Sequence, residues 1–374
     1  MSESSRRIFL SAPDLGPEEA AVASARISAG EIGAIGADVG RFEGDLGTYG
    51  GFAAVAALNS GSAALHLGLK LLGVGPGDAV ICPDFTFVGG VNAIVHLGAR
   101  PIFADVEPGG FGLDPALTDD AFTLARREGL KVAAIVPADL YGRACDLDGV
   151  LAAARGVPVI TDTAEGLGAR RNGRHAGKGA TATVLSFNAN KIITTAGGGA
   201  LASDDTDLIE RARRLGLQSK LPGPGYEHDQ AGFNYRMSNL SAAIGRVQLE
   251  SLEEKIARRR AIAALYCSAD LPGVAFDPEP EGERWTGWLS VARLDLMAFP
   301  GGPDAVIAAL AEQNIEARPV WSPMRRQAAF EPALSIGGER ADRLRATCLC
   351  LPSGSGLSDD EIGRVCEAMK ALAR

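Results

Sequence analysis

Ser186-Phe187-Asn188-Ala189-Asn190-Lys191-Ile192-Ile193-Thr194-Thr195-Ala196-Gly197-Gly198-Gly199 places one lysine ahead of a glycine triplet. Upstream, Val159-Ile160-Thr161-Asp162-Thr163-Ala164-Glu165-Gly166 is an apolar run that leads into an aspartate. A pyridoxal phosphate (PLP) enzyme needs a lysine that condenses with the aldehyde and an aspartate that keeps the pyridine nitrogen protonated. The pair therefore predicts that Lys191 binds PLP covalently and that Asp162 pairs with the ring nitrogen. Singly, a solvated lysine and a helix-capping aspartate are the plainer interpretations.

A phosphate site is expected where Asn59-Ser60-Gly61-Ser62-Ala63-Ala64 opens a helix. Free amides and the positive end of the helix dipole attract anions at such a position. The small residues Gly61, Ser62 and Ala63 let a phosphate approach, and Ser186 can add a hydroxyl. The alternative is an ordinary helix cap.

Two further side chains are candidates for contacts with the cofactor ring. Phe87 follows the strand end at Pro83-Asp84 and can stack on the pyridine face. Glu165 lies three residues after Asp162, about one helical turn on, so it can face the phenolic oxygen of the cofactor. A core phenylalanine and a carboxylate in the first turn of a helix are the alternatives.

Composition excludes several other classes of protein. The chain has 374 residues and a net charge of −9, which argues against a nucleic-acid partner because such a partner needs a basic face. The six cysteines form no CxxC pair and there are only four histidines, so we expect no metal site. No apolar stretch reaches the ~18 residues of a membrane span. The first ten residues contain no apolar signal core, so a cytoplasmic protein is expected.

Short apolar runs alternate with helical patterns along most of the chain. Helices are expected at 62–72, 88–97 and 238–252, and strands at 79–82, 101–104, 132–136 and 157–160. This alternation predicts a mainly parallel sheet that binds its ligand at the carboxyl ends of the strands, where Asp162 falls. The charged run at 253–260 is interpreted as the solvated face of a long helix. We expect a large α/β domain at residues 1–250, with an N-terminal helical segment, and a smaller α+β domain at 251–374.

These residues resemble the DegT/DnrJ/StrS family of PLP-dependent nucleotide-sugar aminotransferases. The resemblance covers nearly the whole chain and rests on the segments 60–67, 75–78, 140–142, 162–166, 186–191, 232–240 and 351–353. It implies the aspartate aminotransferase fold, known as PLP fold type I. It also implies PLP that cycles with pyridoxamine phosphate, and L-glutamate as amino donor.

The resemblance assigns roles to the matching positions. Lys191 would hold PLP, Asp162 would bind the ring nitrogen, Glu165 would lie near the ring oxygen, and Phe87 would stack. The remaining cofactor contacts would come from Gly61, Ser62, Ala63, Ser186, Asn188 and Asn234. Asn234 would reach the phosphate of a neighbouring subunit, which implies a homodimer with shared active sites.

The substrate implied by the resemblance is a UDP-linked 4-keto-6-deoxy-N-acetyl sugar of glycan biosynthesis. The stretch 186–195 is closest to the transaminases of bacillosamine-type pathways, and the segment 318–324, with Trp321, fits the same subgroup. Asp139 and Arg325 depart from it, because both replace a usual histidine. We expect Asp139, Trp321 and Arg325 near the sugar nucleotide, with the Arg325 fork suited to a diphosphate.

Other functions remain open at this point. The enzyme could act on a dTDP- or GDP-linked keto sugar or on a keto-cyclitol. A PLP-dependent sugar dehydratase is a further alternative, although its relatives carry histidine in place of the lysine. A non-catalytic, sugar-sensing regulator on the same scaffold is the third.

Overall fold

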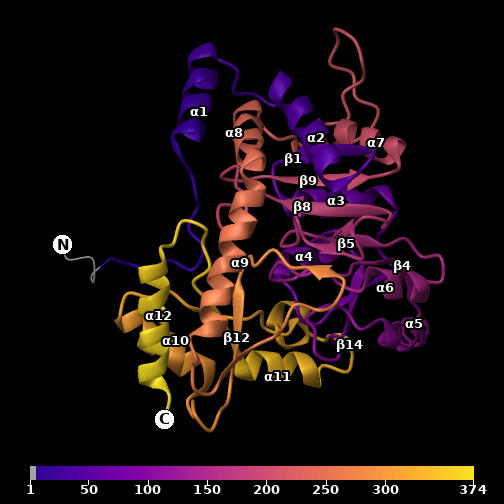
Figure 1. The fold of residues 1–374 in the computed structure, drawn as a ribbon. Helices are drawn as coiled ribbons and strands as arrows, with labels where there is room; N and C mark the ends of the chain where they lie inside the picture. Colours follow the sequence, from indigo (N-terminus) through magenta and orange to yellow (C-terminus); the bar gives the residue numbers. More distant parts are fainter. Residues whose placement is uncertain (1–5) are drawn as a thin grey trace.

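The computed structural model describes residues 6–374 of the chain. Two helices come first, α1 (Pro17–Ala29) and α2 (Ala37–Gly50). Each ends at a glycine in the left-handed conformation, Gly30 and Gly51, both with φ of 72°, which a residue with a Cβ rarely adopts. At each of these glycines the helix ends and the chain changes direction toward the rest of the molecule (Figure 1).

The large sheet forms from strands that are far apart in sequence. Two four-stranded ladders have the orders β1-β9-β8-β5 and β14-β3-β2-β4. Parallel bridges from Ile135 to Val159 and from Ala138 to Asp162 place β4 next to β5. Only β9 runs antiparallel to its neighbours, so the expected mainly parallel sheet is confirmed. The strands are β1 (Ala54–Leu58), β2 (Asp78–Pro83), β3 (Arg100–Ala104), β4 (Lys131–Ile135), β5 (Ile160–Asp162), β8 (Ala182–Ser186), β9 (Gly199–Ser203) and β14 (Leu334–Ile336).

Crossover helices connect the strands of this sheet. They are α3 (Gly61–Leu71), α4 (Val88–His96), α5 (Thr118–Arg127), α6 (Leu147–Ala153) and α7 (Thr206–Gly216). Most expected boundaries agree closely with the structure, but the strand expected at 157–160 begins only at Ile160. Pro158 has no N–H to donate to a ladder; its carbonyl accepts a hydrogen bond from Ile135.

The C-terminal part is α+β. The helices α8 (Asn239–Glu250) and α9 (Leu252–Ser268) follow one another across Ser251 and run between the large sheet on one side and α1 and α12 (Asp359–Leu372) on the other (Figure 1). A four-stranded antiparallel sheet follows, with the order β10-β12-β15-β13. Its strands are β10 (Val274–Phe276), β12 (Ser290–Leu294), β13 (Arg318–Pro319) and β15 (Cys348–Leu351). The helices of this part are α10 (Gly302–Glu312), α11 (Glu339–Thr347) and α12. A small sheet joins β6 (Arg170–Arg171), β7 (Arg174–His175) and β11 (Glu283–Arg284).

Segments from both ends of the chain cross the expected domain boundary. Ile8 pairs with Ile315 of the C-terminal part, and β14 pairs in parallel with β3 at the edge of the large sheet. A boundary at 250/251 falls between α8 and α9, and it remains a prediction. Over residues 6–374, no helix is long and apolar enough to cross a membrane.

The charged run 253–260 is only partly a solvated face. Lys255 and Arg259 point inward and are buried, Arg259 to 1% exposure. The 3.6-residue period of α9 places them on the same side as Leu252, Ile256 and Ile262, which are also buried. The prediction from charge alone was therefore wrong for these two side chains.

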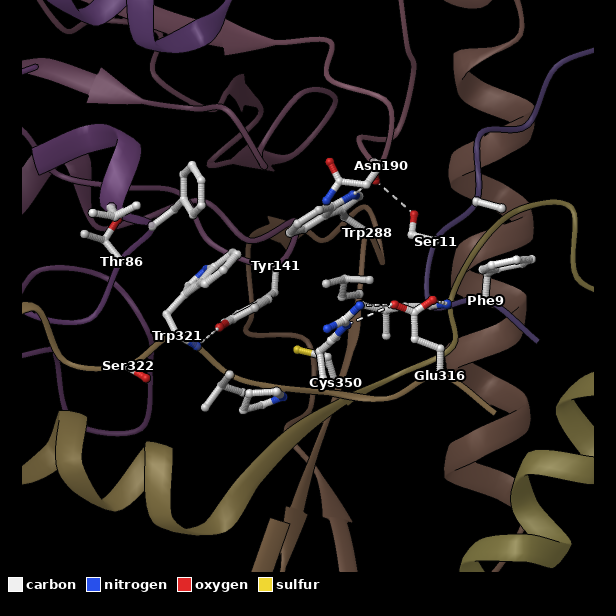
Figure 2. A pocket seen from close by; sticks show the side chains of 18 of the residues that line it. Phe9, Ser11, Thr86, Tyr141, Asn190, Trp288, Glu316, Trp321, Ser322 and Cys350 are labelled. Atoms are coloured by element: carbon white, nitrogen blue, oxygen red, sulfur yellow. Dashed lines mark hydrogen bonds and ion pairs between the residues drawn. The ribbon is translucent and has the colours of Figure 1, made fainter. Parts of the chain in front are cut away.

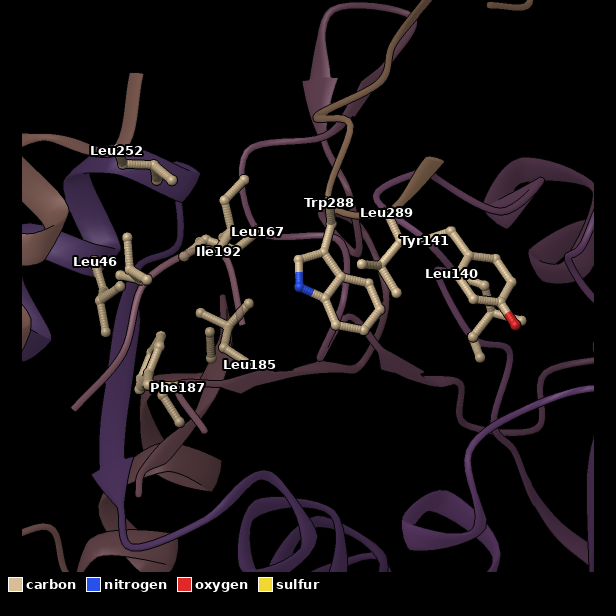
Figure 3. Packing of buried hydrophobic residues seen from close by; sticks show 14 of the residues in the cluster. Leu46, Leu140, Tyr141, Leu167, Leu185, Phe187, Ile192, Leu252, Trp288 and Leu289 are labelled. Carbon is tan, nitrogen blue, oxygen red and sulfur yellow. The ribbon is translucent and has the colours of Figure 1, made fainter. Parts of the chain in front are cut away.

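The loop that carries Lys191 is anchored in the core. Leu185, Phe187 and Ile193 around it are nearly or fully buried. Figure 3 shows Leu185, Phe187 and Ile192 packed between Leu46 and Trp288. Each buried aliphatic or aromatic side chain contributes about 1.5–3 kcal/mol, so the loop is rigid where it holds the lysine.

Candidate active site

Lys191 is nearly buried and faces two groups that attract a positive charge. Its Nζ lies 3.2 Å from Glu165 Oε1 and 4.3 Å from the ring centroid of Trp288. The second oxygen of Glu165 accepts a hydrogen bond from the backbone N–H of Tyr141 at 3.0 Å. Glu165 is therefore fixed between the lysine and a rigid turn.

Asp162 ends β5 and opens onto the same cavity as Lys191. One carboxylate oxygen accepts the N–H of Ala164 at 3.1 Å. The other faces Gly90, where a Cβ would lie only 3.0 Å away. Burial raises the pKa of Asp162 to about 6, and the charge of Lys191 opposes that rise. A cationic ring nitrogen placed against it would keep the carboxylate ionised.

A phosphate cradle lies at the start of α3. Ser60 caps the helix and accepts the N–H of Ala63 at 3.0 Å, while helix geometry gives the amides of Gly61 and Ser62 no intrahelical acceptor. A Cβ on Gly61 would lie 3.1 Å from Ser186 Cβ, so glycine keeps this helix end against β8. The amide of Ala63 is already engaged by the cap, which leaves Gly61, Ser62 and Ser186 as the donors.

An amine, an acid and an anion cradle therefore meet in one cavity of about 290 Å³. They match the aldehyde, the ring nitrogen and the phosphate of PLP, and the residues present fit this cofactor. The sequence-predicted residues that line the cavity are Gly61, Ser62, Phe87, Asp162, Ser186, Asn188, Lys191 and Trp321. Ala63 and Glu165 do not line it, although Ala63 follows Ser62 on α3 and Glu165 contacts Lys191. Asn234 is exposed on the segment after α7.

Asp139 does not line the cavity, although sequence analysis placed it near the substrate. It is 1% exposed and accepts hydrogen bonds from Cys145 N at 2.8 Å and Thr163 Oγ1 at 2.7 Å. Burial raises its pKa to about 6. Asp139 supports the strand end that carries Asp162, and this position explains why a carboxylate there need not contact a sugar.

Arg325 is likewise occupied by protein groups. Its guanidinium pairs with Asp84 and Asp342 and donates to the carbonyl of Gly338 at 3.0 Å. Asp84 follows β2 and is 1% exposed. The fork that sequence analysis assigned to a diphosphate thus joins the end of β2 to α11, and Arg325 lines neither of the two cavities of the site.

A second cavity of about 860 Å³ adjoins the first (Figure 2). The two share Phe87, Asn190 and Trp321. Its wall includes residues that were given no role from the sequence, among them Phe9, Ser11, Tyr141, Trp288, Glu316, Arg318 and Cys350. Tyr141 and Arg318 lie in segments that carry the family resemblance. The chain has only three tryptophans, and the rarity of the residue was the available signal for Trp288.

The family model for the DegT/DnrJ/EryC1/StrS aminotransferases matches residues 13–370. The chain belongs to this aminotransferase family. It is 40% identical to EpsN of Bacillus subtilis strain 168, named as a pyridoxal phosphate-dependent aminotransferase, over 98% of this chain and 96% of EpsN. It is 34% identical to a GDP-perosamine synthase of Caulobacter vibrioides over 97% of both chains.

Solved structures support the same assignment. Spr1654 of Streptococcus pneumoniae, named as a sugar aminotransferase, aligns in its pyridoxamine phosphate form with a TM-score of 0.90. The identity is 26%, and the alignment covers 98% of both chains. This member of the DegT/DnrJ/EryC1/StrS family is therefore a PLP-dependent sugar aminotransferase of fold type I. The expectations for family, fold, class of enzyme and cofactor are confirmed.

Proposed function

We propose that the enzyme moves an amino group from L-glutamate to C4 of a nucleotide-linked 4-keto-6-deoxy sugar. The observation that carries this proposal is the junction of the two cavities, which share Phe87, Asn190 and Trp321 beside Lys191. A volume of about 860 Å³ lies within the range of ligand pockets. A sugar nucleotide seated there would direct its sugar through the shared residues toward the lysine.

The chemistry that bound PLP supplies is an aldehyde to carry the amino group and a ring that withdraws electrons. Asp162 would hold a proton at the ring nitrogen, and the amides at the start of α3 would bind the phosphate. Lys191, once free of the cofactor, would move the proton between the two carbons of the transfer as base and then as acid. Glu165, 3.2 Å from Nζ, would orient the amine for both steps.

Two nucleotides are candidates for the sugar carrier. The resemblance of residues 186–195 to the transaminases of bacillosamine-type pathways favours UDP-2-acetamido-4-keto-2,6-dideoxyhexose. The relative named GDP-perosamine synthase, at 34% identity, favours a GDP-linked keto sugar instead. A dTDP-linked sugar and a keto-cyclitol are further alternatives. A sugar-sensing regulator without turnover is the alternative from another class.

A shared active site in a homodimer is part of the proposal. Asn234 is exposed, and its backbone carbonyl accepts a hydrogen bond from Asn59 Nδ2 at 3.2 Å, next to the phosphate cradle. The segment around it thus passes close to the cofactor end of its own subunit. Its side chain would complete the phosphate site of a partner.

A panel of UDP-, GDP- and dTDP-linked 4-keto-6-deoxy sugars, assayed with glutamate, tests the substrate. We expect amine formation at C4, with the UDP-N-acetyl sugar giving the highest kcat/KM. A preference for the GDP sugar would replace the nucleotide and keep the reaction. Sugar-nucleotide binding without any release of 2-oxoglutarate would favour the regulator.

A further inference from the structure

The carbonyl of Asn190, the residue before Lys191, is held by two donors from distant parts of the chain. Ser11 Oγ donates to it at 2.9 Å and Trp288 Nε1 donates at 2.9 Å. Figure 2 shows Ser11 reaching this carbonyl from the N-terminal segment, with the Trp288 indole beside Asn190. A carbonyl with both donors in place has little freedom to rotate, and the next residue is the lysine.

Arg259 holds both donors in turn. From α9 its Nη1 donates to the backbone carbonyl of Trp288 at 2.7 Å, and its Nη2 donates to Ser11 Oγ at 3.2 Å. It also donates to the carbonyl of Ser353 at 3.1 Å. Arg259 is 1% exposed and, among residues 6–374, makes no ion pair with a carboxylate. A buried cation is costly unless hydrogen bonds compensate, and two of these three compensating bonds lead to the donors of Asn190.

Trp288 contacts both the backbone next to Lys191 and the amine at the end of its side chain. Its N–H binds the carbonyl before Lys191, and its ring face lies 4.3 Å from Lys191 Nζ. The indole is 1% exposed and stacks at 13° on Tyr141, whose N–H binds Glu165. The amine of Lys191 therefore contacts both the aromatic face of Trp288 and the carboxylate of Glu165.

We propose that Arg259, Ser11 and Trp288 form a brace that sets the position of Lys191 for its reaction with PLP and with the amino donor. Ser11 and Trp288 are positioning residues, because they act through the Asn190 carbonyl and, for Trp288, through its ring. The proposal rests on Lys191 being the lysine that binds PLP. It does not depend on the identity of the sugar.

The test uses Ser11→Ala, Trp288→Phe and the double variant in the full-length protein. Trp288→Phe keeps an aromatic ring and removes the N–H. The first readout is the rate at which protein freed of PLP captures it covalently, followed by absorption. The second is the glutamate half-reaction of the loaded enzyme, separated into its maximal rate and the glutamate concentration that gives half of it.

Since either donor alone still holds the carbonyl, each single variant should slow capture and the half-reaction only about threefold. The double variant should slow both about a hundredfold, because the lysine is then misplaced. The half-saturating glutamate concentration should change little. A merely structural role would instead lower both rates in proportion to the loss of Tm.

Two matched variants control for general loosening. Ser355→Ala removes a 2.7 Å hydrogen bond to Asp14, which is one of the anchors of the same N-terminal segment at a point away from Asn190. Tyr266→Phe removes another buried side-chain donor to a backbone carbonyl, that of Pro352 at 2.8 Å, from the same helix that carries Arg259. Both should keep the capture rate within about twofold of the wild type.

Two results would overturn the brace but leave the lysine assignment intact. The double variant could capture PLP as fast as the controls, or its slowing could equal the product of the slowing in the two single variants. Lys191→Ala should capture no PLP covalently. Covalent capture by Lys191→Ala would overturn the lysine assignment and the brace with it, so the two failures are distinguishable.

Discussion

At the scale of single residues, two buried carboxylates in and behind the site are costly to ionise. Asp139 and Asp162 are adjacent carboxylates, and burial raises the pKa of each to about 6. Each folded carboxylate therefore holds its proton more tightly than the unfolded chain does, near 3.8. Stability from the protonated form is present below about pH 4 and is lost as the pH rises through about 6.

Asp139→Asn should consequently stabilise the protein relative to the wild type as the pH rises. The amide oxygen can still accept from Cys145 N, and no buried charge forms. The difference in free energy of unfolding should grow by up to about 3 kcal/mol between pH 4 and pH 8, because a shift of about two units is worth that much. Denaturant unfolding of both proteins, freed of PLP, at the two pH values measures it. A constant difference would mean that the pKa of Asp139 is the same in the folded and unfolded protein.

The site residues that could be predicted from the sequence are those that PLP chemistry restricts to one residue type and that follow one another along the chain in a typical order. Lys191, Asp162 and Ser186 satisfy that requirement, and the cavity brings them together. Ser11 and Trp288 were missed because they lie 179 and 98 positions from Asn190. Contacts over such separations depend on how the sheets and helices pack, which no local pattern records.

At the scale of elements, the junction between β2 and α11 depends on one ion-pair cluster. Asp84 accepts the backbone N–H of Arg325 at 2.8 Å, and its carbonyl accepts that of Met324 at 2.6 Å. Arg325 also reaches Asp342 on α11. Burial raises the pKa of Asp84, and the Arg325 charge opposes that effect.

Arg325→Gln should therefore lower the free energy of unfolding by about 3–5 kcal/mol, because it leaves Asp84 buried without its cation. Arg326→Gln is the matched control. Arg326 also pairs with Asp342, but its side chain is 65% exposed, so its loss should cost less than about 1 kcal/mol. Denaturant unfolding at neutral pH compares the two. Equal losses would show that the Asp84 contact contributes nothing beyond a surface pair.

The positions of helices could be predicted well from the sequence where the spacing of apolar residues was clear. The helices α3 and α4 begin at Gly61 and Val88, next to the expected starts, because their apolar spacing is clear. Arg259 was assigned to solvent from its charged neighbours, whereas the period of α9 places it inward. Periodicity outweighs charge when the two disagree, provided that hydrogen bonds satisfy the buried group.

At the scale of the whole molecule, the proposed shared site predicts complementation between inactive subunits. Lys191→Ala and an inactive Asn234→Ala variant each damage a different half of the site. In a heterodimer, one of the two sites would carry neither lesion. Since only about half of the dimers in an equal mixture are heterodimers, mixing should restore about half of the activity of a sample in which every dimer has one intact site. Mixtures of each variant with itself are the controls. Absence of recovery in heterodimers verified by differential tagging would contradict the sharing.

The parallel sheet was predictable from the amino-acid sequence, but the strand at its edge was not. Residues 334–336 supply β14 to the edge of the large sheet, beside β3, from the far side of the expected boundary at 250/251. Three residues among irregular neighbours give no usable periodicity. The pairing exists because the chain between Trp321 and α11 is anchored by Asp84 and returns along β3.

This late strand sets an order of events during synthesis. Until residues 334–336 have left the ribosome, β3 has no neighbour on that side, and its outer N–H and C=O groups remain open to other chains. Lys191, Asp162 and the whole phosphate cradle are translated long before that point. The nascent chain therefore contains every residue of the cofactor site while its largest sheet still has an exposed edge, so a chain cut at 250 would be prone to aggregate through β3.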